Sequence, residues 1–116
     1  MSAHVAHAAS LAHFVAALAA GDLMRAGRCL GEDRLVDPAR LLLVPSARAV
    51  LDAMCKAGAY GVCLAGAGPS LLALTEAGPL AARIARAGEA AWRMAGVAAH
   101  AGIRRLDRRG ARLLHR

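Results

Sequence analysis

The apolar positions of the first thirty residues repeat with the period of a helix. From Ser2 to about Ala20 they fall three or four residues apart, which predicts an amphipathic helix whose stripe comprises His7, Leu11, Phe14, Val15 and Leu18. Gly21 is typical of a helix end, and the carboxylate of Asp22 can accept free backbone N–H groups at the start of a second helix over residues 23–30.

Prolines punctuate the next part of the chain. Residues 31–45 are polar at first and then apolar, and Pro38 and Pro45 favour an ordered loop over a regular element. Ser46 can cap a third helix that runs to Ala57. The side chains expected to face inward from this helix are Val50, Leu51 and Met54.

After Gly58 the period of the pattern changes. Residues 60–66 and 70–76 are short apolar runs on either side of the letters GAGP, which predicts a strand, a tight turn and a second strand. Pro79 is well placed at the first turn of a fourth helix that reaches roughly Ala99. Its buried stripe is expected to comprise Leu80, Ile84, Ala87, Ala91 and Met94 or Ala95.

Two further strands are predicted in the C-terminal tail, at residues 103–106 and 111–114, with the letters DRRG turning between them. Taken together, the elements indicate an α+β fold in which helices pack on one face of a mostly antiparallel sheet. With 116 residues, 58% of them apolar and 20% charged, the chain is expected to be one globular domain.

The formal net charge of +7 is compatible with a nucleic-acid partner. However, the chain has one Phe, one Tyr and one Trp for base stacking, and it lacks the spacing of a helix-turn-helix or zinc finger. Anionic small substrates, or a GC-rich genome that favours arginine, explain the charge equally well. We therefore expect no nucleic-acid partner.

Residues 57–75 carry no charge, which raises the question of a membrane span. Several glycines and Pro69 interrupt this run, so we expect no membrane partner. Three widely spaced cysteines without a CxxC motif, and a first segment without a basic signal region, favour a reduced, cytoplasmic setting. His4 and His7 share a helix face but have no evident third ligand, so no metal site is expected.

The turn Gly66–Ser70, with the letters GAGPS, is the chain's strongest candidate for chemistry. A dinucleotide fingerprint needs GxGxxG, but position 71 is Leu, and the GK[ST] of a Walker loop is absent. Spacing alone favours a glycine turn between two core strands. It also leaves open a turn whose backbone N–H groups cradle an anion.

A family resemblance sharpens this picture. The letters GAYGVCLAGAGPSLLAL, residues 58–74, resemble the third conserved motif of the GHMP kinases, of the form GAxGxxxSGAGPS/TxxAL. The proline after GAG is more similar to homoserine kinases than to mevalonate kinases. Upstream, a homoserine kinase pattern D-R-[IV]-x-[EQ]-P-x-R followed by a proline is matched by Asp33, Arg34, Pro38, Arg40 and Pro45.

The resemblance extends over nearly the whole chain and implies a ferredoxin-like GHMP kinase C-terminal domain over residues 1–116. The family uses ATP and Mg²⁺ to phosphorylate the hydroxyl of homoserine in threonine biosynthesis. The resemblance implies that Arg40 binds the homoserine carboxylate. The alternative is an arginine that is solvated on a loop. Asp33 and Arg34 could instead form an ion pair that shapes the loop. The residues implied to support the nucleotide loop near the phosphates are Gly66, Ala67, Gly68, Pro69 and Ser70.

The chain also departs from the family. The nucleotide loop PxxxGLGSSAA, the metal-binding acidic residue and the usual first strand of the domain are absent, and Ala65 replaces the usual serine. We therefore expect no catalytic side chain here, no ATP bound by this chain alone, and a need for an N-terminal GHMP kinase half as partner. The alternative is a non-catalytic stand-alone binding or orphan domain. An open sheet edge and uncovered apolar surface would also favour self-association, so a homo-oligomer is an alternative to a monomer.

Overall fold

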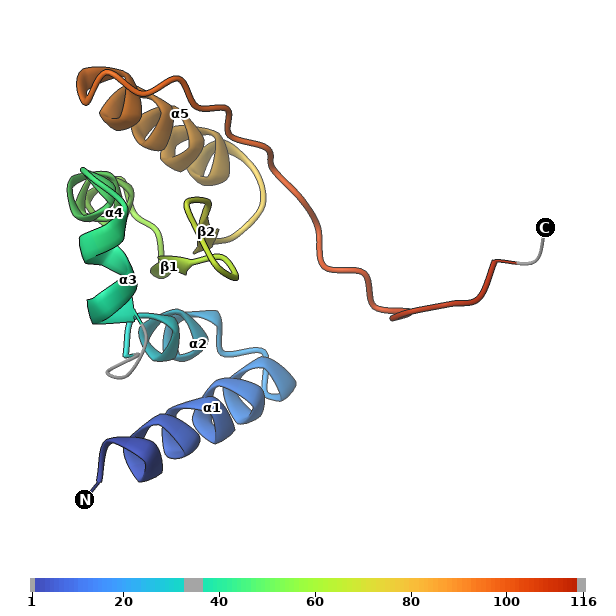
Figure 1. Ribbon diagram of the computed structural model, residues 1–116. Helices are drawn as coiled ribbons and strands as arrows, with labels where there is room; N and C mark the ends of the chain where they lie inside the picture. The colour runs from blue at the N-terminus through green and yellow to red at the C-terminus, as the bar shows by residue number, and fades with distance from the viewer. Residues whose placement is uncertain (1, 33–36, 115–116) are drawn as a thin grey trace.

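The computed structural model describes residues 2–32 and 37–114, which form five helices and a two-stranded antiparallel sheet (Figure 1). The α+β class and the antiparallel strand pair are confirmed. The elements in chain order are α1 (Ala3–Ala19), α2 (Leu23–Leu30), α3 (Asp37–Leu43), α4 (Ala47–Lys56), β1 (Gly61–Leu64), β2 (Leu71–Leu74) and α5 (Pro79–Met94).

The two strands form a hairpin whose register runs from Gly61 opposite Leu74 to Leu64 opposite Leu71. In Figure 1 the hairpin lies between the α1–α2 pair and the α4–α5 pair. As expected, helices pack against the sheet. Helix α4 contacts both strands, and α5 packs against α4. Helix α2 adds a second contact with β1.

Helices α1 and α2 begin as the sequence predicts. The hydroxyl of Ser2 accepts a hydrogen bond from the Val5 amide at 3.3 Å, and the carboxylate of Asp22 accepts one from the Arg25 amide at 3.0 Å. The predicted apolar stripe of α1 is only partly covered, however. Leu11 is 60% exposed, and the buried residue of this helix is Ala17. A small side chain is buried there because α2 packs closely against α1.

The predicted loop over residues 31–45 is wrong in its second half, where residues 37–43 form helix α3. Pro38 is compatible with this helix because it lies in the first turn, where its missing N–H needs no helical partner. Asp33 and Arg34 lie outside the described residues. Ser46 does precede α4, but its backbone is left-handed (φ 68°) and its side chain makes no capping hydrogen bond.

Helix α5 ends at Met94 rather than near Ala99. Gly96, two residues after its end, has a left-handed φ of 78°, and the Val97 amide donates a hydrogen bond to the Trp92 carbonyl at 2.9 Å, an arrangement typical of a helix C-terminus. The predicted stripe is wrong at Met94, which is 90% exposed. The residues that α5 buries are Ala81, Ile84 and Gly88.

The two strands predicted in the tail do not form. Residues 103–106 and 111–114 run extended without a pairing strand, and in Figure 1 the tail leaves the domain after passing α5. Only the turn is found, where the Arg109 amide donates to the Asp107 carboxylate at 2.8 Å. A segment of chain becomes a strand only where another backbone can satisfy its N–H and C=O groups, and the tail has no such neighbour among the described residues.

The core is built mainly from small side chains, which let the elements approach closely. Its buried apolar residues are Ala17, Ala26, Ala47, Val50, Val62, Leu64, Ala81 and Ile84. The closest approach joins α2 to β1, because a Cβ added to Gly27 would overlap the backbone of Tyr60, and one added to Gly61 would overlap Gly27. This packing positions the hairpin, and therefore the glycine turn at its tip.

Candidate functional site

The glycine turn closes the hairpin with two hydrogen bonds of its own. The Ala65 amide donates to the Ser70 carbonyl at 2.8 Å, and the Gly68 amide donates to the Ala65 carbonyl at 3.1 Å. Gly66 and Gly68 have φ angles of 58° and 79°, which side chains with a Cβ rarely adopt. The turn therefore depends on glycine at both positions.

The outer side of the turn presents backbone to solvent. Gly66, Ala67, Pro69 and Ser70 are exposed, and Gly68 is half-buried. Within the described chain, the amides of Gly66 and Ala67 have no hydrogen-bond partner. Two neighbouring N–H groups on an exposed turn can bind an anion such as a phosphate oxygen. The geometry is thus compatible with the anion cradle left open by the sequence.

Arg40 reaches the same turn from helix α3. Its Nη1 donates a hydrogen bond to the Gly66 carbonyl at 2.6 Å across 26 positions of sequence. The side chain is half-buried, so it is not simply a solvated loop arginine. The structure therefore brings the two predicted parts of the site, Arg40 and the glycine turn, into direct contact. Sequence reasoning placed both but did not predict this bond.

Val44 is a contributor to the site that the sequence analysis missed. A Cβ built on Gly68 would lie 3.6 Å from Val44 Cγ2 and 3.6 Å from Leu64 Cδ2, which is ordinary contact. Gly68 is therefore required for its φ angle and not for lack of space. The signal for Val44 was the apolar run before Pro45, which was assigned to a loop.

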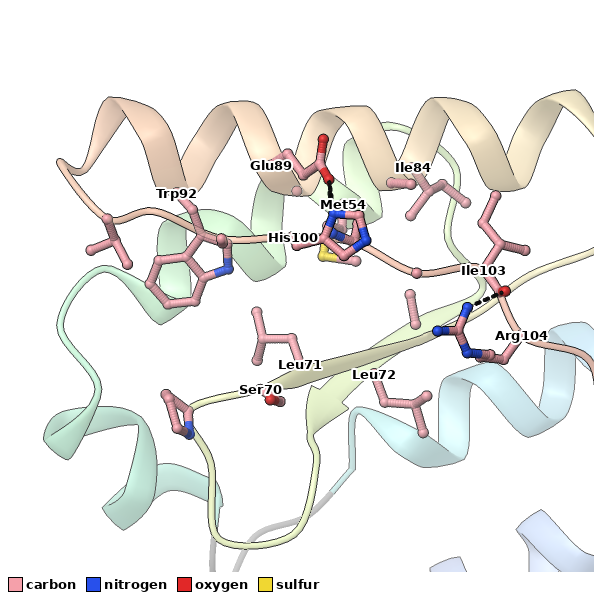
Figure 2. A pocket seen from close by; sticks show the side chains of 18 of the residues that line it. Met54, Ser70, Leu71, Leu72, Ile84, Glu89, Trp92, His100, Ile103 and Arg104 are labelled. Carbon is pink, nitrogen blue, oxygen red and sulfur yellow. Dashed lines mark hydrogen bonds and ion pairs between the residues drawn. The ribbon is translucent and has the colours of Figure 1, made fainter.

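A groove lies beside the turn, between α5, β2 and the first residues of the tail. It has a volume of about 670 Å³, and its lining includes Pro69 and Ser70 of the turn (Figure 2). Figure 2 shows Trp92 and Ile84 on the α5 side and Leu71 on the strand side. A smaller hollow of about 230 Å³ lies where α1, α2 and β1 meet.

Two ionisable groups have shifted pKa values. Burial, with a smaller contribution from the nearby Asp52 charge, raises the pKa of the Cys55 thiol. A hydrogen bond to Glu76 is the main cause that raises the pKa of the Tyr60 phenol. Neither group lies in the glycine turn, so no general acid or base is assigned there. In residues 2–32 and 37–114, no group of three or more His, Cys, Asp and Glu could hold a metal ion.

None of the described helices is both long enough and apolar enough to cross a membrane. The charge-free segment of residues 57–75 instead contains the hairpin and its turn.

Comparison with known families decides the relationship. The family model described as "GHMP kinases C terminal" matches residues 14–93, which include Arg40 and the whole glycine turn. The chain belongs to the C-terminal domain family of the GHMP kinases.

Relatives within the GHMP kinases are named as homoserine kinases. The chain is 34% identical to "Homoserine kinase" of Arabidopsis thaliana over 97% of its own length and 30% of that protein. It is 39% identical to "Homoserine kinase" of Pyrococcus furiosus over 90% of its length and 34% of that protein. This GHMP kinase C-terminal domain therefore spans roughly a third of the length of these relatives.

A solved structure gives the same result for this domain in three dimensions. The crystal structure of homoserine kinase from Cytophaga hutchinsonii superimposes with a TM-score of 0.77 at 33% identity. The match covers 82% of this chain and 30% of that one. The fold expected from the resemblance is therefore confirmed.

Proposed function

We propose that this chain is the C-terminal domain of a homoserine kinase, which transfers a phosphoryl group from ATP to the homoserine hydroxyl in threonine biosynthesis in the cytoplasm. In this proposal residues 1–116 act only with an N-terminal nucleotide-binding domain, and the chain alone is inactive. The homoserine kinase relatives support the substrate and the reaction. The observation that carries the proposal is the bond between Arg40 and the glycine turn, because it joins the two regions to which the resemblance assigns a role.

The glycine turn is assigned to the phosphate end of the site. Phosphoryl transfer depends chiefly on positioning and on stabilising charge, and rigid N–H donors supply both without moving. The outward amides of Gly66 and Ala67 fit this task because no described group competes for them. Gly68, Pro69 and Ser70 hold the turn in shape, with Ser70 closing it through its carbonyl.

ATP and Mg²⁺ are implied by the family, and this chain fits only part of that requirement. The exposed amides of the turn suit phosphate oxygens. When bound, Mg²⁺ neutralises charge on the phosphates. The described residues contain no cluster of acidic side chains that could hold it. We therefore assign the metal ligands, and the main ATP contacts, to the N-terminal domain.

Arg40 is assigned to the carboxylate of homoserine. Its bond to the Gly66 carbonyl uses one of the five N–H donors of a guanidinium, so the planar fork keeps donors for a carboxylate. One side chain would thereby connect the substrate to the turn at the phosphate end. Such a link would fix the distance between the two reactants, which is a large part of catalysis by positioning.

The second candidate function is a stand-alone binding domain that kept the fold and lost the chemistry. It is favoured by Ala65 at the position of the usual serine. The two functions differ in one measurable respect, since only the first predicts kinase activity when an N-terminal kinase domain is joined to this chain.

The test is a fusion of this chain to the N-terminal portion of the Cytophaga hutchinsonii homoserine kinase, ended where the structural match begins. We expect ADP release that depends on both ATP and homoserine from the fusion, and none above background from the chain alone. An inactive fusion that binds ATP normally would favour the binding domain. Kinase activity of the isolated chain would contradict the proposal that it acts only with an N-terminal nucleotide-binding domain.

Within that fusion, Arg40→Ala should weaken homoserine binding about ten- to a hundredfold, because a charged hydrogen bond is lost. The affinity for ATP should change much less. Arg48→Ala, an exposed arginine on α4, is the matched control and should change neither. Equal losses of homoserine and ATP affinity would remove the role assigned to Arg40.

Gly68→Val should act differently, lowering turnover without discriminating between homoserine and ATP. A β-branched residue is strained at a φ of 79°, so the turn would lose its shape. Ala77→Val places the same side chain on an exposed loop position outside the turn and should retain most of the activity. A fully active Gly68→Val fusion would make the turn a connection between strands and nothing more.

A further inference from the structure

Helix α1 packs against the rest of the domain along one side. Its contacts with other described elements are mainly with α2, and Figure 1 shows α2 between α1 and the hairpin. The covered side of α1 carries Ser10, Phe14 and Ala17, which are half-buried or buried. The opposite side of this 17-residue helix is open to solvent.

The open side of α1 is apolar. Its large side chains are Val5, Leu11 and Val15, which are 55%, 60% and 58% exposed. Ala8 and Ala12 are also exposed and lie among them, because residues three or four positions apart are neighbours on a helix surface. We call these five residues the α1 outer face.

The α1 outer face differs in charge from the solvent sides of other helices in the chain. None of the 15 Lys and Arg residues or the 8 Asp and Glu residues is in α1. By contrast, α4 exposes Arg48 and Lys56, and α5 exposes Arg86 and Arg93. A helix that borders water normally carries charged and polar residues on the side away from the core. The composition of α1 therefore indicates that its outer face is covered in the assembled protein.

The spacing of residues on the α1 outer face fits a second helix. Val5, Ala8, Ala12 and Val15 are separated by three, four and three positions, which is the repeat along which one helix packs on another. The two alanines in the middle let the helix axes approach closely. The valines at the two ends add apolar area to the contact.

We propose that the α1 outer face binds the same face of a second copy of this chain, in a two-fold symmetric dimer. Such a contact needs one surface only, because each copy contributes the same residues. Charge favours this occupant. Two copies with a net charge of +7 repel each other, and a contact through α1 brings no Lys or Arg of one helix against the other.

The N-terminal portion of the kinase is a less suitable occupant. The proposed function assigns it to the glycine turn, which belongs to the hairpin, and α2 separates α1 from the hairpin (Figure 1). The dimer does not depend on that proposed function. A helix pair of this length, about 25 Å, buries an area near the lower end of specific interfaces, so we expect a weak dimer with a Kd of about 10 to 100 µM.

The test is sedimentation velocity of the isolated chain over a range of concentrations around that Kd. We expect a monomer–dimer equilibrium that Ala12→Glu weakens at least about tenfold, because it buries a charge from each copy in the contact. Ala90→Glu makes the same substitution at an exposed position of α5 and should leave the equilibrium unchanged. Circular dichroism should show that both variants keep their helices. Equal effects of the two variants, or a chain that stays monomeric at the highest concentration, would overturn the proposal.

The open edge of β2 is a second surface at which two copies could meet. Leu72→Glu puts a charge on this strand, where Leu72 is 54% exposed. We expect the dimer to persist in this variant. Dissociation caused by Leu72→Glu and not by Ala12→Glu would place the contact on β2 and overturn our assignment.

The fusion with the Cytophaga hutchinsonii N-terminal portion separates this inference from the proposed function. We expect the fusion to dimerise and Ala12→Glu to make it monomeric without changing its affinity for homoserine. An inactive fusion that dimerises in this way would contradict the kinase assignment and retain the dimer. An active fusion that stays monomeric at concentrations where the isolated chain dimerises would identify the N-terminal portion as the cover of α1 and overturn the dimer.

Discussion

The two strands of the hairpin are alike in sequence and opposite in environment. Each has four apolar residues, GVCL in β1 and LLAL in β2. In β1, Gly61, Val62 and Leu64 are buried, whereas no residue of β2 is buried and Leu72 is 54% exposed. The cause lies in their neighbours, because β1 is covered by α2 as well as α4 while the far edge of β2 borders the groove.

The contrast shows that an apolar strand is buried only as far as other elements cover it. On β1 the cover is unusually close, since the backbones of Gly27 and Gly61 are in direct contact. On β2 the cover is missing on one side, where the N–H and C=O groups stay unpaired within the described chain. Strand β1 is therefore part of the core, whereas β2 has an edge that no described backbone covers.

The largest expected effect comes from disturbing the β1 side. Gly27→Ala puts a methyl group into the backbone of Tyr60, which cannot give way as a flexible side chain would. We expect a loss of about 3 kcal/mol in the free energy of unfolding, measured by denaturant titration. Gly31→Ala, at the end of the same helix, meets only ordinary contact and should change it by less than about 0.5 kcal/mol. Similar losses from both variants would show that α2 is not tightly packed on β1.

A smaller effect should follow from shortening side chains on the two strands. Val62 is 2% exposed, so Val62→Ala should cost about 2 kcal/mol through lost burial and a cavity. Leu72→Ala removes more atoms but should cost the isolated chain less than about 1 kcal/mol, because Leu72 is 54% exposed. A larger loss of stability from Leu72→Ala than from Val62→Ala, in thermal or denaturant unfolding, would contradict the contrast between the two strands.

The smallest effect concerns Tyr60, which joins the hairpin at its open end. Its pKa is raised above the ordinary value near 10, so the stabilising contribution is complete below that pH and disappears as the pH rises through the folded-state pKa. Tyr60 is the one tyrosine of the chain, so the ultraviolet absorbance of tyrosinate reports it directly. Glu76→Gln should move this titration back toward the ordinary pKa, whereas Glu32→Gln, a charge-matched control in the turn after α2, should not.

Much of the local structure could be predicted from the sequence. The helix cap at Asp22 and the strand–turn–strand pattern around the glycines were correct because each depends on residues a few positions apart. The glycine turn and Arg40 were also identified as the candidate site, through their resemblance to a family motif. These residues were chosen from short stretches of chain, and their roles stay predictions.

Sequence reasoning failed where distant elements decide the outcome. Residues 37–43 form a helix despite Pro38, and the tail residues 103–106, predicted as a strand, are unpaired. The stripe of α5 was misplaced at Met94, because alanine-rich helices have several faces of nearly equal apolar character. In each case the pattern allowed more than one structure, and the choice depended on which neighbour was present.

The sequence by itself determined the hairpin, its glycine turn and the start of α2, because propensity, capping and left-handed glycines act over a few residues. Only the tertiary structure decided that Arg40 touches the glycine turn, that Gly27 lies on β1, and that β2 has an open edge. The physical reason is the separation along the sequence between the residues that interact. Contacts between residues 26 or more positions apart depend on how whole elements pack, and that packing is set by the summed shapes of many small side chains.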